Sequence, residues 1–407
     1  MKRTFIIAVA VLAMAGMVFA QELASARLYK KQGEWLKSLD FYNQVLEKAP
    51  SLLDAYFERG ELYYDVLSDS SKVELAQPMA GETENPERVL LERMVADFQQ
   101  ATIEHTPKDK SKIRKFQKAI DRMLQTRWNH HYFIAVLCDS LYDQNVGAGV
   151  TDPDPKQHLL KGVEELDLAI VALPAKWNAY GLRAQILGKL TRADESLESW
   201  NQALERIRAS DMKKEQPDEY EQAVQVIQGK LLQGNYSLNR YRETVELADQ
   251  ILAKDSANID ALQFKAFALA QLGTDESMTQ EERNEYKSRA ITALEAAKKA
   301  RPDDPTILYY IGQFNLQLAD TAAALAAFNE FLTKEEKDRD VLFALGVIYL
   351  EGGTFADTVK ARDTFAKLVE HFPDDGAGWT NYGVALIRLR EIDKGREAIE
   401  KGKTARP

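Results

Sequence analysis

The sequence predicts an all-α chain built from consecutive helix–turn–helix units. Apolar residues recur at spacings of three and four, which is the period of a helix and not of a strand. A phrase ending in glycine also returns at a fixed distance, since Gly312 and Gly346 lie 34 residues apart. Pro373 and Pro407, each closing a predicted helical stretch, are separated by the same 34 residues. This periodicity indicates a repeat architecture rather than several independent domains.

Each predicted unit has two halves with their own pattern. The first half carries a large residue, a second residue three positions on and then a glycine, as in Tyr56-x-x-Arg59-Gly60, Leu342-x-x-Leu345-Gly346 and Trp379-x-x-Tyr382-Gly383. The second half places a small residue four positions before an aromatic one, as in Ser38-x-x-x-Tyr42, Ser196-x-x-x-Trp200, Ala324-x-x-x-Phe328 and Ala361-x-x-x-Phe365. We expect the glycine to lie where the two helices cross, because a larger side chain would hold the backbones apart.

The units start near residues 21, 53, 127, 177, 217, 259, 305, 339 and 376. Three of them carry insertions between their helices, at about 66–86, 144–155 and 274–281, and a helical stretch at 109–126 has no evident partner. We therefore divide the chain into a signal peptide (1–20), N-terminal repeats with inserted loops and an extra helix (21–176), middle repeats (177–258) and regular C-terminal repeats (259–407).

This pattern resembles the tetratricopeptide repeat, a helix–turn–helix unit of 34 residues. The resemblance implies a right-handed α-solenoid of stacked helix pairs whose first helices line a concave face. It also implies a protein or peptide partner, bound in the groove of the solenoid. The inward positions in the C-terminal half are then Gln263, Phe267, Tyr309, Gln313, Phe343, Val347, Thr380 and Val384. Aromatic and amide side chains of this kind suit an extended segment or a helix with apolar anchors.

The first twenty residues are typical of a secretory signal. Lys2 and Arg3 precede an apolar run from Phe5 to Phe19, which is too short for a spanning helix. We expect cleavage after Ala20 and, since no cysteine follows, a periplasmic or secreted protein without a lipid anchor; an uncleaved anchor is the alternative. Cleavage changes the formal charge from −10 to −12, because two cations leave. So acidic a chain disfavours nucleic acid as a partner.

Paired and clustered acids are the first candidates for chemistry. Asp303-Asp304 and Asp374-Asp375 each follow the proline that closes a unit, so we expect them to cap the next helix rather than to hold a metal. Asp152-Pro-Asp154-Pro lacks the remaining ligands of a calcium loop and is interpreted as a stiff inter-helix loop.

A second candidate cluster combines His130, His131, Cys138 and Asp139. Adjacent histidines on a helix point about 100° apart, so these side chains should not converge on one ion. Cys138 lies in an apolar run, which predicts a buried and inert thiol. The sequence therefore predicts no catalytic residue, no metal site and no cofactor.

A basic segment stands out in this acidic chain. Lys110, Arg114 and Lys118 share one helical face at four-residue spacing. A solvated face is one interpretation. The other is contact with an anionic headgroup, a cell-wall polymer or an acidic partner.

Three functions are compatible with these features. The first is a protein–protein interaction scaffold or adaptor of the bacterial cell envelope. The second is an enzyme or accessory subunit that acts through the inserted segments 66–126 and 143–156. The third is a self-assembling structural array, that is, a homo-oligomer. The repeated pattern favours the first of them, because stacked repeats create extended binding surfaces.

Overall fold

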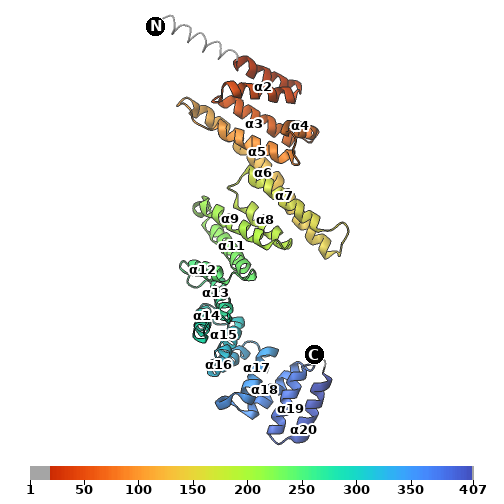
Figure 1. Cartoon of the computed structure of the whole chain (residues 1–407), viewed down its shortest axis with the longest axis vertical. Helices are drawn as coiled ribbons and strands as arrows, with labels where there is room; N and C mark the ends of the chain where they lie inside the picture. Colours follow the sequence, from red (N-terminus) through yellow and green to blue (C-terminus); the bar gives the residue numbers. More distant parts are fainter. Residues whose placement is uncertain (1–18, 406–407) are drawn as a thin grey trace. The chain divides into compact units, whose positions relative to one another are not determined.

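Helices arranged in consecutive pairs account for most of the computed structural model, which describes residues 19–405 (Figure 1). The first pairs are residues 19–32 with α2 (Trp35–Lys48), α3 (Leu53–Ser68) with α5 (Pro86–Ala101), α6 (Asp109–Gly147) with α7 (Lys156–Ala172), and α8 (Trp177–Lys189) with α9 (Ala193–Ala209). The following pairs are α11 (Pro217–Ser237) with α12 (Tyr241–Leu252), α13 (Ile259–Leu272) with α14 (Gln280–Ala300), α15 (Pro305–Gln317) with α16 (Thr321–Leu332), α17 (Arg339–Glu351) with α18 (Thr358–His371), and α19 (Gly376–Arg388) with α20 (Ile392–Thr404). Short helices η1 (Ser70–Leu75), α4 (Ala76–Ala80), α10 (Met212–Glu215) and η2 (Gly353–Phe355) lie in the connections.

The predicted all-α solenoid of helix–turn–helix units is confirmed, and residues 19–405 contain no strand. Residues 1–18, which hold most of the predicted signal peptide, lie outside the described part of the chain. Within that part, no helix is both long and apolar enough to cross a membrane.

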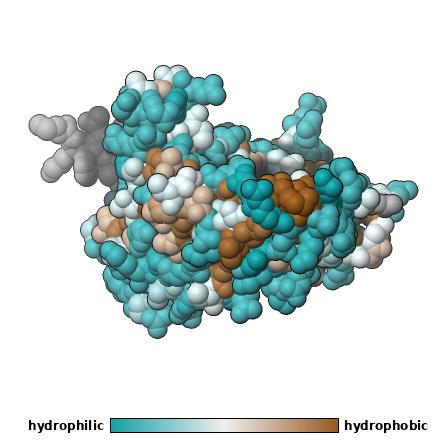
Figure 2. All heavy atoms as spheres, turned by 90° about the horizontal axis from the view of Figure 1, so that it is seen from below, coloured by the Kyte–Doolittle hydropathy of each residue, from teal (hydrophilic) through white to brown (hydrophobic). Residues whose placement is uncertain are grey.

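The chain forms two compact units, residues 1–227 and 228–407, with the boundary inside α11. Each has hydrophobic clusters of its own, centred on residues such as Leu90 and Leu166 in the first and Leu269 and Phe328 in the second. The division into segments 21–176, 177–258 and 259–407 stays a prediction. Most side chains on the face shown in Figure 2 are hydrophilic, and hydrophobic ones reach the surface in only a few places.

Tight turns join the two helices of many pairs. The turn residue has a positive φ at Gly33, Thr191, Asn239, Ala319 and Arg390. A nearby amide then reaches back to the first helix, for example from Asp320 N to Asn315 O at 2.9 Å. This pattern closes the first helix and is usually built on glycine, because other residues are strained in the left-handed region.

Replacing Ala319 by glycine should therefore stabilise the α15–α16 pair. Alanine at φ 59° carries left-handed strain of about 1 kcal/mol that glycine does not have. Glycine's greater freedom in the unfolded chain offsets part of the gain. Slower hydrogen exchange of α15 and α16 in Ala319→Gly would support this account, and faster exchange would contradict it.

The predicted close approach at the repeat glycine is confirmed. A Cβ atom placed on Gly60, Gly312 or Gly346 would lie 2.5, 2.3 or 2.6 Å from a phenylalanine ring of the second helix. These rings belong to Phe98, Phe328 and Phe365 and are fully or almost fully buried. In the last pair the contact is between backbones, since a Cβ on Gly383 would lie 2.5 Å from Gly395 O.

The second acid of each pair caps a helix, as expected. The carboxylate of Asp304 accepts a hydrogen bond from Thr306 N, and that of Asp375 accepts one from Gly378 N. Asp303 forms an ion pair with Lys334. Carboxylates at these positions accept hydrogen bonds from the free amides of the first turn and interact favourably with the positive end of the helix dipole.

The stretch 109–126 is not a separate helix. It is the N-terminal part of α6, a continuous helix of 39 residues whose C-terminal part pairs with α7. The preceding pair packs on the N-terminal part, where the rings of Phe57 and Phe116 stack with centroids 4.1 Å apart and Lys112 forms an ion pair with Asp54 at 2.6 Å. The prediction separated the two segments because the repeat pattern starts only near residue 127. No proline, glycine or cap interrupts the helix there, and only its packing partners change.

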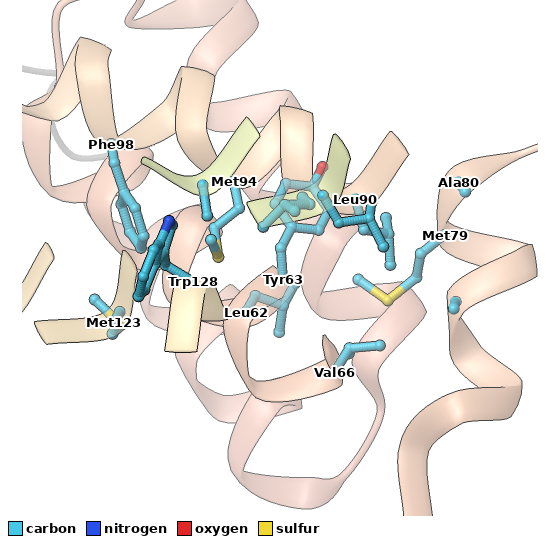
Figure 3. Packing of buried hydrophobic residues seen from close by; sticks show 14 of the residues in the cluster. Leu62, Tyr63, Val66, Met79, Ala80, Leu90, Met94, Phe98, Met123 and Trp128 are labelled. Carbon is cyan, nitrogen blue, oxygen red and sulfur yellow. The ribbon is translucent and has the colours of Figure 1, made fainter. Parts of the chain in front are cut away.

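The insertion after α3 contributes to the core of the first unit. Met79 and Ala80 of α4 are buried, and Figure 3 shows Met79 beside Val66 and Leu90. Arg93 of α5 donates hydrogen bonds to Met79 O and Ala80 O, at 2.7 and 3.1 Å. Deleting residues 68–85 would therefore remove core packing together with the loop.

Candidate functional site

A groove of about 580 Å³ lies on the first helices of the repeats in the first unit. We call it the aromatic groove; its lining residues come from α6, α8, α9, α10 and α11 and are Tyr132, Trp177, Asn178, Gly181, Leu182, Gln185, Trp200, Met212, Glu219, Gln222, Ala223, Val226 and Ile227. Its size is that of a site for one small ligand or a few side chains of a peptide.

The floor of the aromatic groove is built around Gly181. A Cβ atom on this residue would lie 3.4 Å from the ring of Trp200 and 3.8 Å from that of Trp177. Both rings are half-buried, so each presents part of its surface to the groove. These distances are ordinary van der Waals contacts, so Gly181 is less tightly enclosed than Gly312 or Gly346, and the two rings meet over it.

The walls are apolar and the rim carries amides. Tyr132 stacks on the buried Trp128 with ring centroids 4.5 Å apart, and burial raises the pKa of the Tyr132 phenol. Val226 of α11 is 54% exposed. Asn178, Gln185 and Gln222 provide donors and acceptors at the edge, where Gln185 also donates to Asp139 at 3.2 Å. Glu219 is the one charged residue that lines the groove.

A buried polar network lies next to this wall, on the other side of α6. The guanidinium of Arg127 donates to Leu67 O at 2.6 Å, to Glu87 Oε1 at 2.6 Å and to His131 Nε2 at 2.8 Å. His131 Nδ1 lies 2.8 Å from Glu165 Oε2. Arg127 and His131 are almost completely buried, and desolvation lowers the pKa of the Arg127 guanidinium.

The network determines the tautomer of His131. An arginine side chain can only donate, so Nε2 of His131 must accept. The ring proton is therefore on Nδ1 and is donated to Glu165. This arrangement joins α3, α5, α6 and α7 and holds the wall that carries Tyr132.

The expected groove positions of the second unit are mostly half-buried. Phe267 packs edge-on against Tyr310 with centroids 4.5 Å apart, and Phe343 packs edge-on against Phe365 at 6.0 Å. Tyr309 lies 5.3 Å from the Tyr310 ring, and burial raises the pKa of its phenol. Gln263, Gln313, Val347 and Val384 are also half-buried, and Thr380 is exposed.

These contacts show that several of the predicted groove side chains also support the core. Phe343 and Val347 pack against the cluster around Phe365, and Phe267 packs against the cluster around Leu269. Changing Tyr309 or Phe343 to alanine would therefore alter packing as well as the surface. A binding role for these positions stays a prediction.

The remaining sequence candidates have structural partners. Cys138 is buried, and burial raises the pKa of its thiol. Asp139 forms an ion pair with Lys189 at 2.7 Å, away from His131. Asp154 accepts a hydrogen bond from Lys156 N at the start of α7. Within residues 19–405, no three His, Cys, Asp or Glu side chains are placed to share a metal ion.

The basic segment is exposed on the N-terminal part of α6. Lys110 lies 3.7 Å from Glu104, whereas Arg114 and Lys118 have no ion-pair partner among the described residues. Their shared face is solvated in this structure. Contact with an anionic surface stays a prediction.

Sequence reasoning missed the aromatic groove because it searched the most regular repeats. Trp200 entered the prediction only as the aromatic residue of the second-half pattern, and Trp177 had no predicted role. Two tryptophans on either side of Gly181 were the available signal. The Arg127–His131–Glu165 network had no such signal. Arg127 and His131 lie on α6, whereas Glu165 and Glu87 lie on other helices and far away in sequence.

Comparison with known proteins identifies the repeat. Residues 283–336 and 316–357 match one tetratricopeptide repeat family, and residues 340–375 match another. No curated protein matches the chain.

Several solved structures are similar in part. A crystal structure of MamA is 16% identical, covers 42% of this chain and 91% of its own, and has a TM-score of 0.36. TTC0263, a thermophilic tetratricopeptide-repeat protein of Thermus thermophilus, is 19% identical, covers 52% of this chain and 99% of its own, and has a TM-score of 0.34. The residues matched by the families span α15 to α18 and most of α14, so the repeats expected from the 34-residue period are present in the second unit. Residues 283–375 of this chain therefore carry tetratricopeptide repeats.

Proposed function

We propose that this protein is an interaction scaffold of the bacterial cell envelope that binds an apolar segment of a partner in the aromatic groove. Tetratricopeptide repeats form extended surfaces lined by their first helices. The single observation that carries the proposal is the exposed surface of Trp177 and Trp200 on either side of Gly181. Tryptophan is enriched among residues that dominate binding energy, because it buries a large area with few rotatable bonds.

The chemistry of the groove limits the partner. An apolar floor with amide-bearing edges suits a peptide that inserts one or two large apolar side chains. Asn178, Gln185 and Gln222 can then pair with its backbone. Because Glu219 is the one charge lining the groove, a neutral or basic segment fits better than an acidic one.

An envelope location rests on the N-terminal residues. A basic start followed by a short apolar run and Val18-Phe19-Ala20 is the pattern of a cleaved secretory signal. The single cysteine is compatible with an oxidising compartment, since no internal disulfide is needed.

Val226→Glu should abolish or strongly weaken peptide binding in this groove. Val226 is 54% exposed, so the change adds a carboxylate to the groove without opening the core. An incoming apolar side chain would have to desolvate that carboxylate, which weakens binding at least about tenfold. The measurement is fluorescence anisotropy with labelled twelve-residue peptides, first selected on the unmodified protein from a random phage-displayed library.

Val73→Glu is the matched control, because Val73 lies in the same unit, is 67% exposed and is outside the groove. Selected peptides should bind this variant as they bind the unmodified protein. Equal affinity for Val226→Glu would place the peptide site elsewhere. Loss of binding in Tyr309→Ala with retained helicity would then favour the second unit.

A further inference from the structure

An apolar stripe that no element of residues 19–405 covers runs along the C-terminal part of α6. Phe133, Val136, Leu137 and Leu141 are exposed, and Phe133 reaches 61%. Because they belong to one continuous helix at spacings of three and four, they lie on one face. We call these four residues the α6 stripe. None of them lines the aromatic groove.

The stripe is exposed because the preceding helix pair packs only on the N-terminal part of α6. Lys112, Phe116 and Arg127 of α6 contact Asp54, Phe57 and Leu67 of α3, respectively. Beyond Arg127, the other faces of α6 are occupied. Cys138 faces Gly162 of α7, and Asp139 pairs with Lys189 of α8.

On α6 itself, the exposed side chains between residues 126 and 142 are all uncharged. Between residues 126 and 142 of α6 the other exposed side chains are Thr126, Asn129, His130 and Ser140. Burial and the neighbouring Arg127 lower the pKa of His130, which disfavours the charged ring. Arg127 is buried and Asp139 is paired with Lys189, so this stretch exposes no Asp, Glu, Lys or Arg outside an ion pair, in a chain that is 29% charged.

This absence of charge favours a second copy of the chain as the occupant. In a two-fold interface each residue near the axis meets its own image, so any charge there would face a like charge. The stripe avoids this repulsion. Its order is also symmetric, since Phe133 and Leu141 lie four residues on either side of Leu137.

We propose that the α6 stripe is a self-association surface on which α6 of a second copy packs antiparallel, with Leu137 at the two-fold axis. Phe133 of one copy then contacts Leu141 of the other, and rows at four-residue spacing interdigitate as in ordinary helix packing. His130 and Gln144 fall opposite each other at the rim, where both can form hydrogen bonds.

The area predicts a reversible dimer. The four side chains expose roughly 300 Å² of apolar surface, the size of the largest patch on many monomers. A stable interface buries about 800 Å² on each partner, so the neutral rim must supply the rest. We expect dissociation in the micromolar range. Tyr132 of the aromatic groove lies one turn from Val136, so the proposed interface borders the groove without including its lining residues.

Leu137→Glu should convert the dimer to a monomer. Light scattering coupled to size exclusion would be measured on the full chain after signal removal, from about 1 μM to 0.1 mM. The unmodified protein and the control Val73→Glu should approach the dimer mass, and Leu137→Glu should dissociate at least about tenfold more readily. A monomeric unmodified protein throughout this range, or an unchanged dimer in Leu137→Glu, would overturn the proposal.

A cysteine variant tests the geometry independently of affinity. In a Cys138→Ala background, Leu137→Cys places two thiols at the axis, so mild oxidation should give a disulfide-linked dimer. Lys118→Cys in the same background should remain uncrosslinked, because it lies about five turns away on the solvated part of α6. Crosslinking at Lys118 but not at Leu137 would contradict the antiparallel pairing. Crosslinking is measured without peptide and peptide affinity is measured on the unmodified chain, so the two proposals can fail separately.

Discussion

Arg127→Ala should lower the free energy of unfolding of the first unit by about 2–4 kcal/mol. The guanidinium makes hydrogen bonds to Leu67 O, Glu87 and His131, and the alanine leaves the first and third of these acceptors buried without a donor. Glu87 is partly exposed, so water can replace its share of the interaction. The estimate therefore lies below the cost of breaking a fully buried ion pair.

Urea unfolding followed by tryptophan fluorescence would measure this change. Four of the five tryptophans, Trp35, Trp128, Trp177 and Trp200, lie in the first unit, and Trp128 is next to the altered residue. Arg122→Ala is the matched control, because Arg122 is exposed on the same helix. A shift no larger than that of the control would mean that the network does not stabilise the unit. Repeat chains need not unfold in one step, so the first transition is the quantity to compare.

Phe365→Ala should destabilise the α17–α18 pair by about 3–5 kcal/mol, because the ring is fully buried and its loss leaves a cavity. Gly346→Ala in the unmodified protein should cost about 1–3 kcal/mol, since the new methyl group would lie 2.6 Å from the same ring. The two changes should not add. With the ring absent, the methyl group of Gly346→Ala fills part of the cavity and also favours the helix.

The double variant should therefore be more stable than Phe365→Ala alone. Hydrogen exchange of the α17 and α18 amides measures each variant locally and completes the double-mutant cycle. Gly147→Ala is the control for helix propensity, because no atom lies within 4 Å of its added Cβ and α6 ends there. It should be neutral or slightly stabilising. Additive effects of Gly346→Ala and Phe365→Ala would show that glycine is not required by the ring.

Local rules explain how much of the fold the sequence revealed. Helix existence, the 34-residue period and the caps at Asp304 and Asp375 depend on neighbouring residues, so they were predictable. The contact of Gly312 with Phe328 was also predictable, because both lie in one repeat phrase and one helix pair. Where this phrase weakened, between about 66 and 176, the prediction separated residues 109–126 from the helix that contains them.

The candidate site was less accessible to such reasoning. The aromatic groove collects side chains from five helices, and exposure of Trp177, Trp200 and Val226 depends on what each neighbouring helix leaves uncovered. A helical pattern shows which residues share a face, and it does not show whether another element covers that face. For the same reason the apolar run before Cys138, which includes Phe133 and Leu137, predicted burial, although the structure exposes these two residues.

By itself the sequence therefore determined an all-α repeat chain, most of its helix pairs and the caps at Asp304 and Asp375, because these depend on spacing within about 34 residues. Only the tertiary structure decided that α4 enters the core, that Arg127 joins His131 and Glu165, and that the stripe of α6 lacks a neighbour. The physical reason is that burial is a property of packed surfaces. Because α6 is so long, the preceding helix pair packs on its N-terminal part and leaves the stripe uncovered. No local pattern in the residues of α6 indicates where that packing ends.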